Sequence, residues 1–79
     1  MLLKVKLFTT MVRYVHGARA GVPFDIELAA NATISDLVGH LKIPAPEVKI
    51  IFVNGRNQPL DYLLKNGDEV GIFPAIGGG

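Results

Sequence analysis

Cysteine is absent from this chain of 79 residues. Its absence excludes a disulfide scaffold, a thiolate zinc site, an iron–sulfur cluster and a cysteine nucleophile. The chain is also short, so it has enough residues for one hydrophobic core and none for a separate catalytic domain. Any chemistry that this protein takes part in must therefore use groups other than thiols.

An excess of charge of one sign is missing as well. The chain has 8 lysine and arginine residues against 7 aspartate and glutamate residues, for a formal net charge of +1. A nucleic-acid-binding protein normally carries clustered basic residues, so nucleic acid is not an expected partner. Residues 1–24 contain lysine and arginine residues but no aspartate or glutamate. We interpret them as ordinary solvated charge, with a docking surface as the alternative.

No apolar run in the sequence reaches the roughly 18 residues that a membrane-spanning helix needs. Lys4 and Lys6 interrupt the apolar N-terminal segment, and nothing there resembles a signal peptide. We therefore expect a soluble, cytoplasmic protein that does not bind membranes.

Alternating apolar and polar residues predict two strands, at residues 2–8 and 22–28. The connection over residues 9–21 is too long for a tight hairpin, and we expect a short helical turn within it. A run rich in β-branched residues predicts a central strand at residues 48–53, and residues 69–73 predict the final strand.

One helix is predicted between the two pairs of strands. Thr33 and Asp36 have the spacing of a capping box, in which each side chain accepts a hydrogen bond from the other residue's backbone amide. The residues that follow place one apolar stripe on a helix that must end before Pro44. The stripe consists of Ile34, Leu37, Val38 and Leu41.

The order of these elements is β-β-α-β-β. One helix packed on one face of a mixed sheet of four to five strands buries all the apolar stripes in few residues. We therefore predict an α+β fold of the β-grasp (ubiquitin-like) type over residues 1–76, followed by a flexible tail over residues 77–79.

Three glycines occupy residues 77–79. Glycine loses the most conformational entropy on ordering, so we expect this tail to be disordered in the free protein. A frayed end without a function is the simplest interpretation. Alternatively, an extended glycine tail can enter a narrow channel in another protein, where side chains would clash, and present a terminal carboxylate to reagents there.

Three motifs surround the last two predicted strands. They are Val53-Asn54-Gly55-Arg56, Asn66-Gly67-Asp68-Glu69-Val70, and Phe73-Pro74 before the terminal glycines. Together with the order of elements, they resemble the MoaD/ThiS family of ubiquitin-like sulfur carriers over essentially the whole chain. The chain is more similar to the small subunit of molybdopterin synthase than to the thiamine-pathway carrier, because it has a long first connection and the Phe73-Pro74 pair.

The resemblance implies that an E1-like adenylating enzyme uses ATP to activate the carboxylate of Gly79, with Gly78 as the penultimate glycine. A sulfur donor protein would then supply the sulfur of a thiocarboxylate. In the molybdopterin branch, the tail enters the large subunit of molybdopterin synthase and delivers sulfur to a pterin precursor. The family pattern needs only two glycines, so Gly78 would take this role if one glycine were trimmed.

On this interpretation the chain is a protein co-substrate with no bound cofactor, and not an enzyme. Three alternatives remain open at the level of sequence. The chain could be a carrier in another pathway, such as thiamine or tungsten-cofactor synthesis. It could be a ubiquitin-like modifier whose activated Gly79 acylates a target lysine, or an interaction module that reacts with nothing.

The register of the third predicted strand suggests a partner surface. If Ile51 and Val53 face the helix, then Ile50 and Phe52 face the open side of the sheet, together with Phe73 of the last strand. Exposed apolar clusters of this kind mark partner surfaces, whereas a register shifted by one residue would place them in the core. The predicted partner-binding residues are Ile50, Phe52, Phe73, Pro74, Ile76 and Gly77.

Two further groupings carry no predicted chemistry. His40 follows Asp36 by four residues on one helix face, which favours a surface pair, because two ligands without a third do not make a metal site. Ser35, His40 and Asp61 supply the residue types of a catalytic triad, but the sequence has no nucleophile elbow or oxyanion motif. We therefore predict neither a metal site nor a triad.

Overall fold

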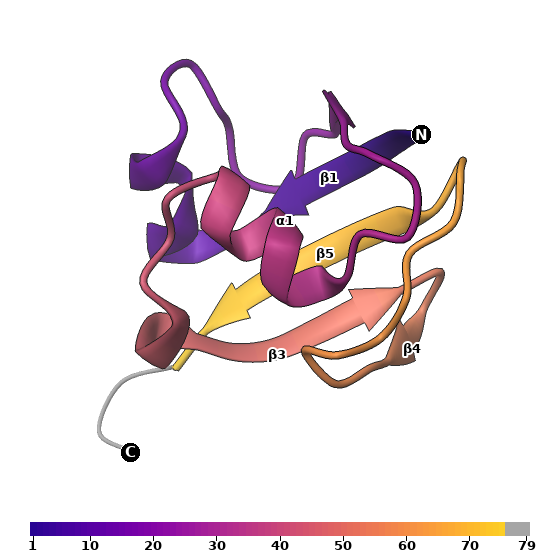
Figure 1. Cartoon of the computed structure of the whole chain (residues 1–79). Coiled ribbons are helices and arrows are strands. Elements are labelled where there is room, and N and C mark those ends of the chain that lie inside the picture. Colours follow the sequence, from indigo (N-terminus) through magenta and orange to yellow (C-terminus); the bar gives the residue numbers. More distant parts are fainter. Residues whose placement is uncertain (76–79) are drawn as a thin grey trace.

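The structure, a computed structural model, describes residues 1–75 of the chain (Figure 1). The predicted site residues Ile76, Gly77, Gly78 and Gly79 lie outside the described residues, as does the predicted boundary between the domain and its tail. The strands are β1 (Leu2–Leu7), β2 (Phe24–Glu27), β3 (Val48–Val53), β4 (Arg56–Asn57) and β5 (Glu69–Pro74). The helix α1 spans Ile34–His40, and two 3-10 helices, η1 and η2, span Thr9–Tyr14 and Ala45–Glu47.

The five strands form one mixed sheet in the order β2-β1-β5-β3-β4. β1 and β5 are parallel, and every other neighbouring pair is antiparallel. Figure 1 shows α1 lying across one face of this sheet, with the opposite face open. This arrangement is the β-grasp fold, which confirms the predicted fold class.

Three details of the predicted strands differ from the structure. The strand at Val48–Val53 forms, but the central position of the sheet belongs to β5. The second strand is shorter than predicted, because the amide of Val22 donates to a turn at Arg19 and Pro23 has no amide to donate. The short strand β4 lies at residues 56–57, where no strand is predicted, and it folds back on β3 after the Asn54-Gly55 turn.

The core lies between α1 and the sheet. Alternation along β1, β3 and β5 buries one face of each strand, as in β1, where Leu3, Val5 and Leu7 are fully buried. The predicted stripe of α1 packs against them. η1 closes one end of the core with the side chain of Met11, which is also fully buried. The helical turn predicted in the long first connection is therefore present as η1.

The predicted capping box begins α1. The Oγ1 atom of Thr33 accepts a hydrogen bond from the Asp36 amide over 3.2 Å, and the Asp36 carboxylate accepts one from the Thr33 amide over 2.8 Å. The helix is two turns long and ends at His40, because Lys42 takes a left-handed conformation with φ of 59°. Within residues 1–75, no helix has the length and apolar character needed to cross a membrane.

Candidate functional site

The open face of the sheet carries the predicted apolar cluster. On β3, Ile51 is 3% exposed beneath the helix, whereas Ile50 is 37% exposed on the opposite side and Phe52 is half-buried there. On β5, Val70 and Ile72 are buried, and Phe73 lies on the open face. The predicted register is confirmed, and the register shifted by one residue is excluded.

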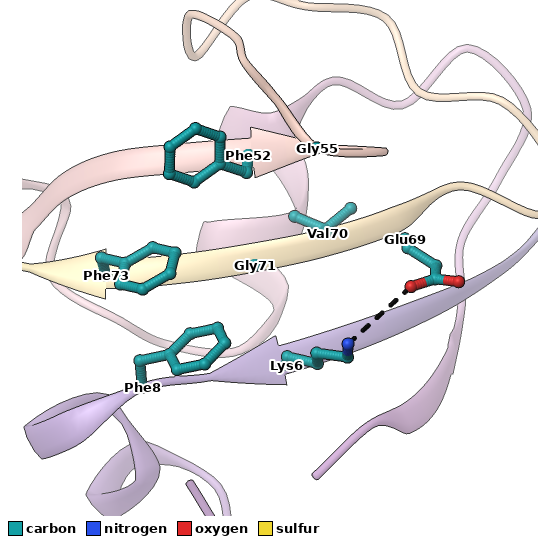
Figure 2. A pocket seen from close by; sticks show the side chains of 8 residues that line it. All are labelled: Lys6, Phe8, Phe52, Gly55, Glu69, Val70, Gly71 and Phe73. Atoms are coloured by element: carbon teal, nitrogen blue, oxygen red, sulfur yellow. Dashed lines mark ion pairs between the residues drawn. The ribbon is translucent and has the colours of Figure 1, made fainter. Parts of the chain in front are cut away.

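A third phenylalanine joins this cluster. Phe8 follows β1 and stacks on Phe73, with ring centroids 4.2 Å apart and ring planes 3° apart. Phe52 meets Phe73 edge to face, with centroids 5.6 Å apart. Figure 2 shows the three rings side by side on β3, β5 and the end of β1. We call Phe8, Ile50, Phe52 and Phe73 the aromatic platform.

Phe8 is not among the residues predicted for the partner surface, although the sequence contains a signal for it. Leu3, Val5 and Leu7 face the core, so Phe8 falls in the alternate set with Lys4 and Lys6, which faces outward. Phe8 therefore belongs to the open face by the same alternation that predicted the strand. What the alternation could not show is that Phe73 lies beside it, because that depends on the parallel pairing of β1 with β5.

A shallow hollow lies on this face between the rings and a pair of charged side chains. It is lined by Lys6, Phe8, Phe52, Gly55, Glu69, Val70, Gly71 and Phe73. The Nζ atom of Lys6 lies 4.0 Å from the Glu69 carboxylate, on the side of the hollow away from the phenylalanines (Figure 2). The hollow is therefore mostly apolar, with one charged edge.

Beyond the hollow, the open face becomes polar. Lys4 on β1 donates a hydrogen bond of 2.8 Å to Asp25 on β2, and this hydrogen bond, with the charge of Asp25, raises the pKa of Lys4. The open face thus has an apolar half at the end where β5 finishes and a half of paired charges at the other. An apolar surface of a partner protein would fit against the apolar half.

The C-terminal end of β5 lies between the two 3-10 helices. Pro74 pairs with Val48, directly after η2, and is buried in the same alternate set as Val70 and Ile72, so it is not part of the platform. Arg13 of η1 donates a hydrogen bond of 2.7 Å to the Glu47 carboxylate of η2, and one of 2.9 Å to the Tyr14 hydroxyl. Tyr14 and Glu47 together raise the pKa of the Arg13 guanidinium.

The motif residues around the last two strands have a structural role. Asn54 and Gly55 both adopt left-handed conformations, with φ of 51° and 84°, which turn the chain from β3 into β4. The Asn54 side chain bonds to both Asp68 and the Glu69 amide, so it ties this turn to the start of β5. In the same region, the Asn66 side chain accepts a hydrogen bond from the amide of Leu2.

The remaining predicted grouping does not form. The Asp36 carboxylate caps α1 at Thr33, and within residues 1–75 no ion pair joins it to His40. The expected surface pair is therefore wrong, because the carboxylate is already bound to the first turn of the helix. In the same part of the chain, no three histidine, cysteine or acidic side chains come together in a way that could hold a metal ion.

Comparisons with known proteins place these features in context. Residues 5–79 match the model of the ThiS family. Among solved structures, a putative molybdopterin converting factor, subunit 1, from Pyrococcus furiosus is 31% identical, with a TM-score of 0.73, over 96% of this chain and 99% of that chain.

Two more distant structures share the fold. SAMP1 from Haloferax volcanii is 23% identical, with a TM-score of 0.70 and full coverage of both chains. A chain from the complex of subunits 1 and 2 of molybdopterin-converting factor from Helicobacter pylori is 22% identical, with a TM-score of 0.62 and full coverage of both. Among curated proteins, no sequence matches significantly. Because the family model covers nearly the whole chain, and the fold and motifs agree with it, this chain belongs to the ThiS family.

Proposed function

We propose that this protein is a sulfur carrier in molybdopterin (molybdenum or tungsten cofactor) biosynthesis, and that it acts as a co-substrate of other enzymes. The observation that carries the proposal is the position of the aromatic platform, directly beside the point where β5 leads into the glycine tail. The 31% identity to a putative molybdopterin converting factor, subunit 1, supports this pathway over the thiamine pathway.

The proposed chemistry takes place at the carboxylate of Gly79. A carboxylate is a poor electrophile, so an E1-like adenylating enzyme first joins it to the AMP portion of ATP and releases pyrophosphate. A sulfide equivalent from a donor protein then attacks the carbonyl carbon, and AMP leaves as the thiocarboxylate forms. The chain itself has no thiol that could intercept the acyl adenylate, because it contains no cysteine.

The length of the tail limits where these enzymes can bind. Four residues follow Ala75, and an extended chain spans at most about 3.6 Å per residue, or about 14 Å in all. An enzyme that holds the carboxylate of Gly79 must therefore also cover the end of β5, where Phe73 and Ile50 are paired. The platform is a partly exposed apolar surface at this place, which suits it for docking.

The same geometry implies that the partners of the tail bind one at a time. The adenylating enzyme and the large subunit of molybdopterin synthase would both need the tail and the platform. Release from the first is then a requirement for binding to the second. A carrier with one docking surface and one reactive end would shuttle between them.

Intact-mass analysis of the protein from its native host tests the proposal. We expect a fraction of molecules whose mass is raised by the replacement of one oxygen by sulfur, and we expect this fraction to disappear when Gly78 and Gly79 are deleted. The variant Gly39→Ala is a matched control, because Gly39 lies on α1 with open space around it. Conjugates to larger proteins, lost on the same deletion, would instead identify a modifier.

A further inference from the structure

Gly71 is the one residue of the open face of β5 that has no side chain, and it lies below the aromatic platform. Its neighbours across the sheet are Lys6 on β1 and Phe52 on β3. Its φ is not in the left-handed region, so its backbone conformation does not require glycine. Any requirement for glycine at this position must come from the space above it.

That space is occupied by two rings of the platform. A Cβ atom built on Gly71 would lie 3.3 Å from Cε2 of Phe8 and 3.5 Å from Cε1 of Phe73. The first distance is shorter than ordinary van der Waals contact, so Phe8 would have to move even for alanine. Valine would add two methyl groups where the stacked rings and the hollow now lie. Gly71 therefore keeps the rings close to the sheet and the hollow open.

We propose that Gly71 determines the specificity of the platform, because it keeps open a hollow that receives one apolar side chain of the E1-like adenylating enzyme. The inference rests on the function proposed above. The reach of the tail limits the occupant to an enzyme that holds Gly79, since such an enzyme must lie over Phe73, which forms one wall of the hollow. The adenylating enzyme is the first to hold Gly79 in the proposed sequence of steps, so we assign the hollow to it. Lys6 and Glu69 at the charged edge face each other, so the hollow presents aromatic walls and one matched charge pair to the incoming side chain.

Replacement of Gly71 by alanine and by valine tests this role. Adenylation is measured as ATP–pyrophosphate exchange by the E1-like enzyme of the source organism, with the intact chain as the varied substrate. We expect the KM for the carrier to rise from glycine to alanine to valine, by about tenfold or more for valine, which is the usual cost of losing one inserted apolar side chain. The kcat should not change, because Gly71 does not contact the reacting carboxylate.

If Gly71 had only a structural role, its replacement would act by destabilising the fold. We expect instead that Gly71→Val keeps the fold, because valine is a better strand former than glycine. Circular dichroism and the melting temperature test this. Gly71→Ala provides a second test if the valine variant does not fold. Cross-relaxation between the ring protons of Phe8 and Phe73 should be present in the wild type and weakened in both variants. Gly39→Ala, on the other side of the molecule, should leave the KM and the ring contacts unchanged.

The outcomes separate this inference from the function on which it rests. If the wild-type chain is adenylated and all variants have the same KM, the role of Gly71 is overturned while the carrier function stands. An increase in KM that Gly39→Ala shares would overturn it too. If the wild-type chain is not adenylated at all, the proposed function fails and the inference fails with it.

Discussion

The side-chain amide of Asn54 donates a hydrogen bond to the carboxylate of Asp68 over 2.9 Å, and so joins the turn after β3 to the turn before β5. Asp68 is only 6% exposed, and its second carboxylate oxygen accepts from the Lys65 amide over 2.8 Å. The Oδ1 atom of the Asn54 side chain in turn accepts a hydrogen bond from the Glu69 amide over 2.9 Å. Two motifs whose bonded residues are 14 and 15 positions apart in sequence thus form one hydrogen-bonded unit.

We expect Asn54→Ala to destabilise the fold by about 2–4 kcal/mol, because it removes two hydrogen bonds, leaves a buried carboxylate with one donor fewer and places alanine in a left-handed conformation. Urea denaturation measures this loss. Asn54→Gly removes the same bonds without the backbone strain, so it should cost about 1 kcal/mol less. A loss below about 0.5 kcal/mol for both variants would show that the network adds nothing to stability.

Much of the fold follows from local patterns in the sequence. The alternation in residues 2–8 and the capping box at Thr33 each depend on residues that are close in sequence, and the structure has β1 over Leu2–Leu7 and the capping box at Thr33. The strand order depends on pairings between distant segments. Residues 48–53 predict a central strand because they are apolar except for Lys49 and rich in β-branched side chains, yet β5 holds that position despite the glycine at its middle.

The candidate site also depends partly on local patterns and partly on pairings between distant strands. The outward direction of Ile50, Phe52 and Phe73 follows from alternation on their own strands. The stack of Phe8 on Phe73 required knowledge that β1 and β5 are neighbours and parallel, as did the role of Gly71 below the rings. Lateral contacts between strands are not encoded in the period of either strand, so a single sequence could not reveal them.

We expect Thr33→Ala to destabilise the protein by about 1 kcal/mol, the usual cost of losing a helix N-cap. The helix is only two turns long, and its first turn has no other side chain that accepts from the Asp36 amide. Ser35→Ala is a suitable control, because Ser35 is exposed in the same turn and its side chain makes no hydrogen bond within residues 1–75. Equal stabilities of the two variants would contradict a capping role for Thr33.

The Tyr14 hydroxyl and the Arg13 guanidinium hold the pKa of the Glu47 carboxyl below its usual value. A carboxyl whose pKa is lower in the folded state stabilises the fold above its unfolded-state pKa, and this contribution is lost as the pH falls through the folded-state pKa. Glu47→Gln should therefore lower the melting temperature slightly at neutral pH. The difference should vanish in acid below the ordinary range of glutamate carboxyl groups, where the wild type is protonated as well.

The effect of Glu47→Gln should be small and should weaken at high salt, because Arg13 is exposed and Glu47 is partly exposed. Glu27→Gln on β2 changes the same charge at a position where the described residues show no ion pair. Its melting temperature should follow that of the wild type at every pH. A Glu47→Gln difference that persists unchanged in acid would mean that packing, and not charge, links η1 to η2.

Truncation of the aromatic platform should weaken docking without unfolding the protein. We expect Phe52→Ala to raise the KM for the carrier in adenylation by about 10- to 100-fold, the range typical of an aromatic residue at the centre of an interface. Leu63→Ala is the matched control, because Leu63 is an exposed apolar residue paired with Thr33 and lies outside the platform. The difference in KM between the two variants should persist at high salt, since apolar contacts are not screened by ions. If Leu63→Ala raised the KM as much as Phe52→Ala, the platform would not be the docking surface.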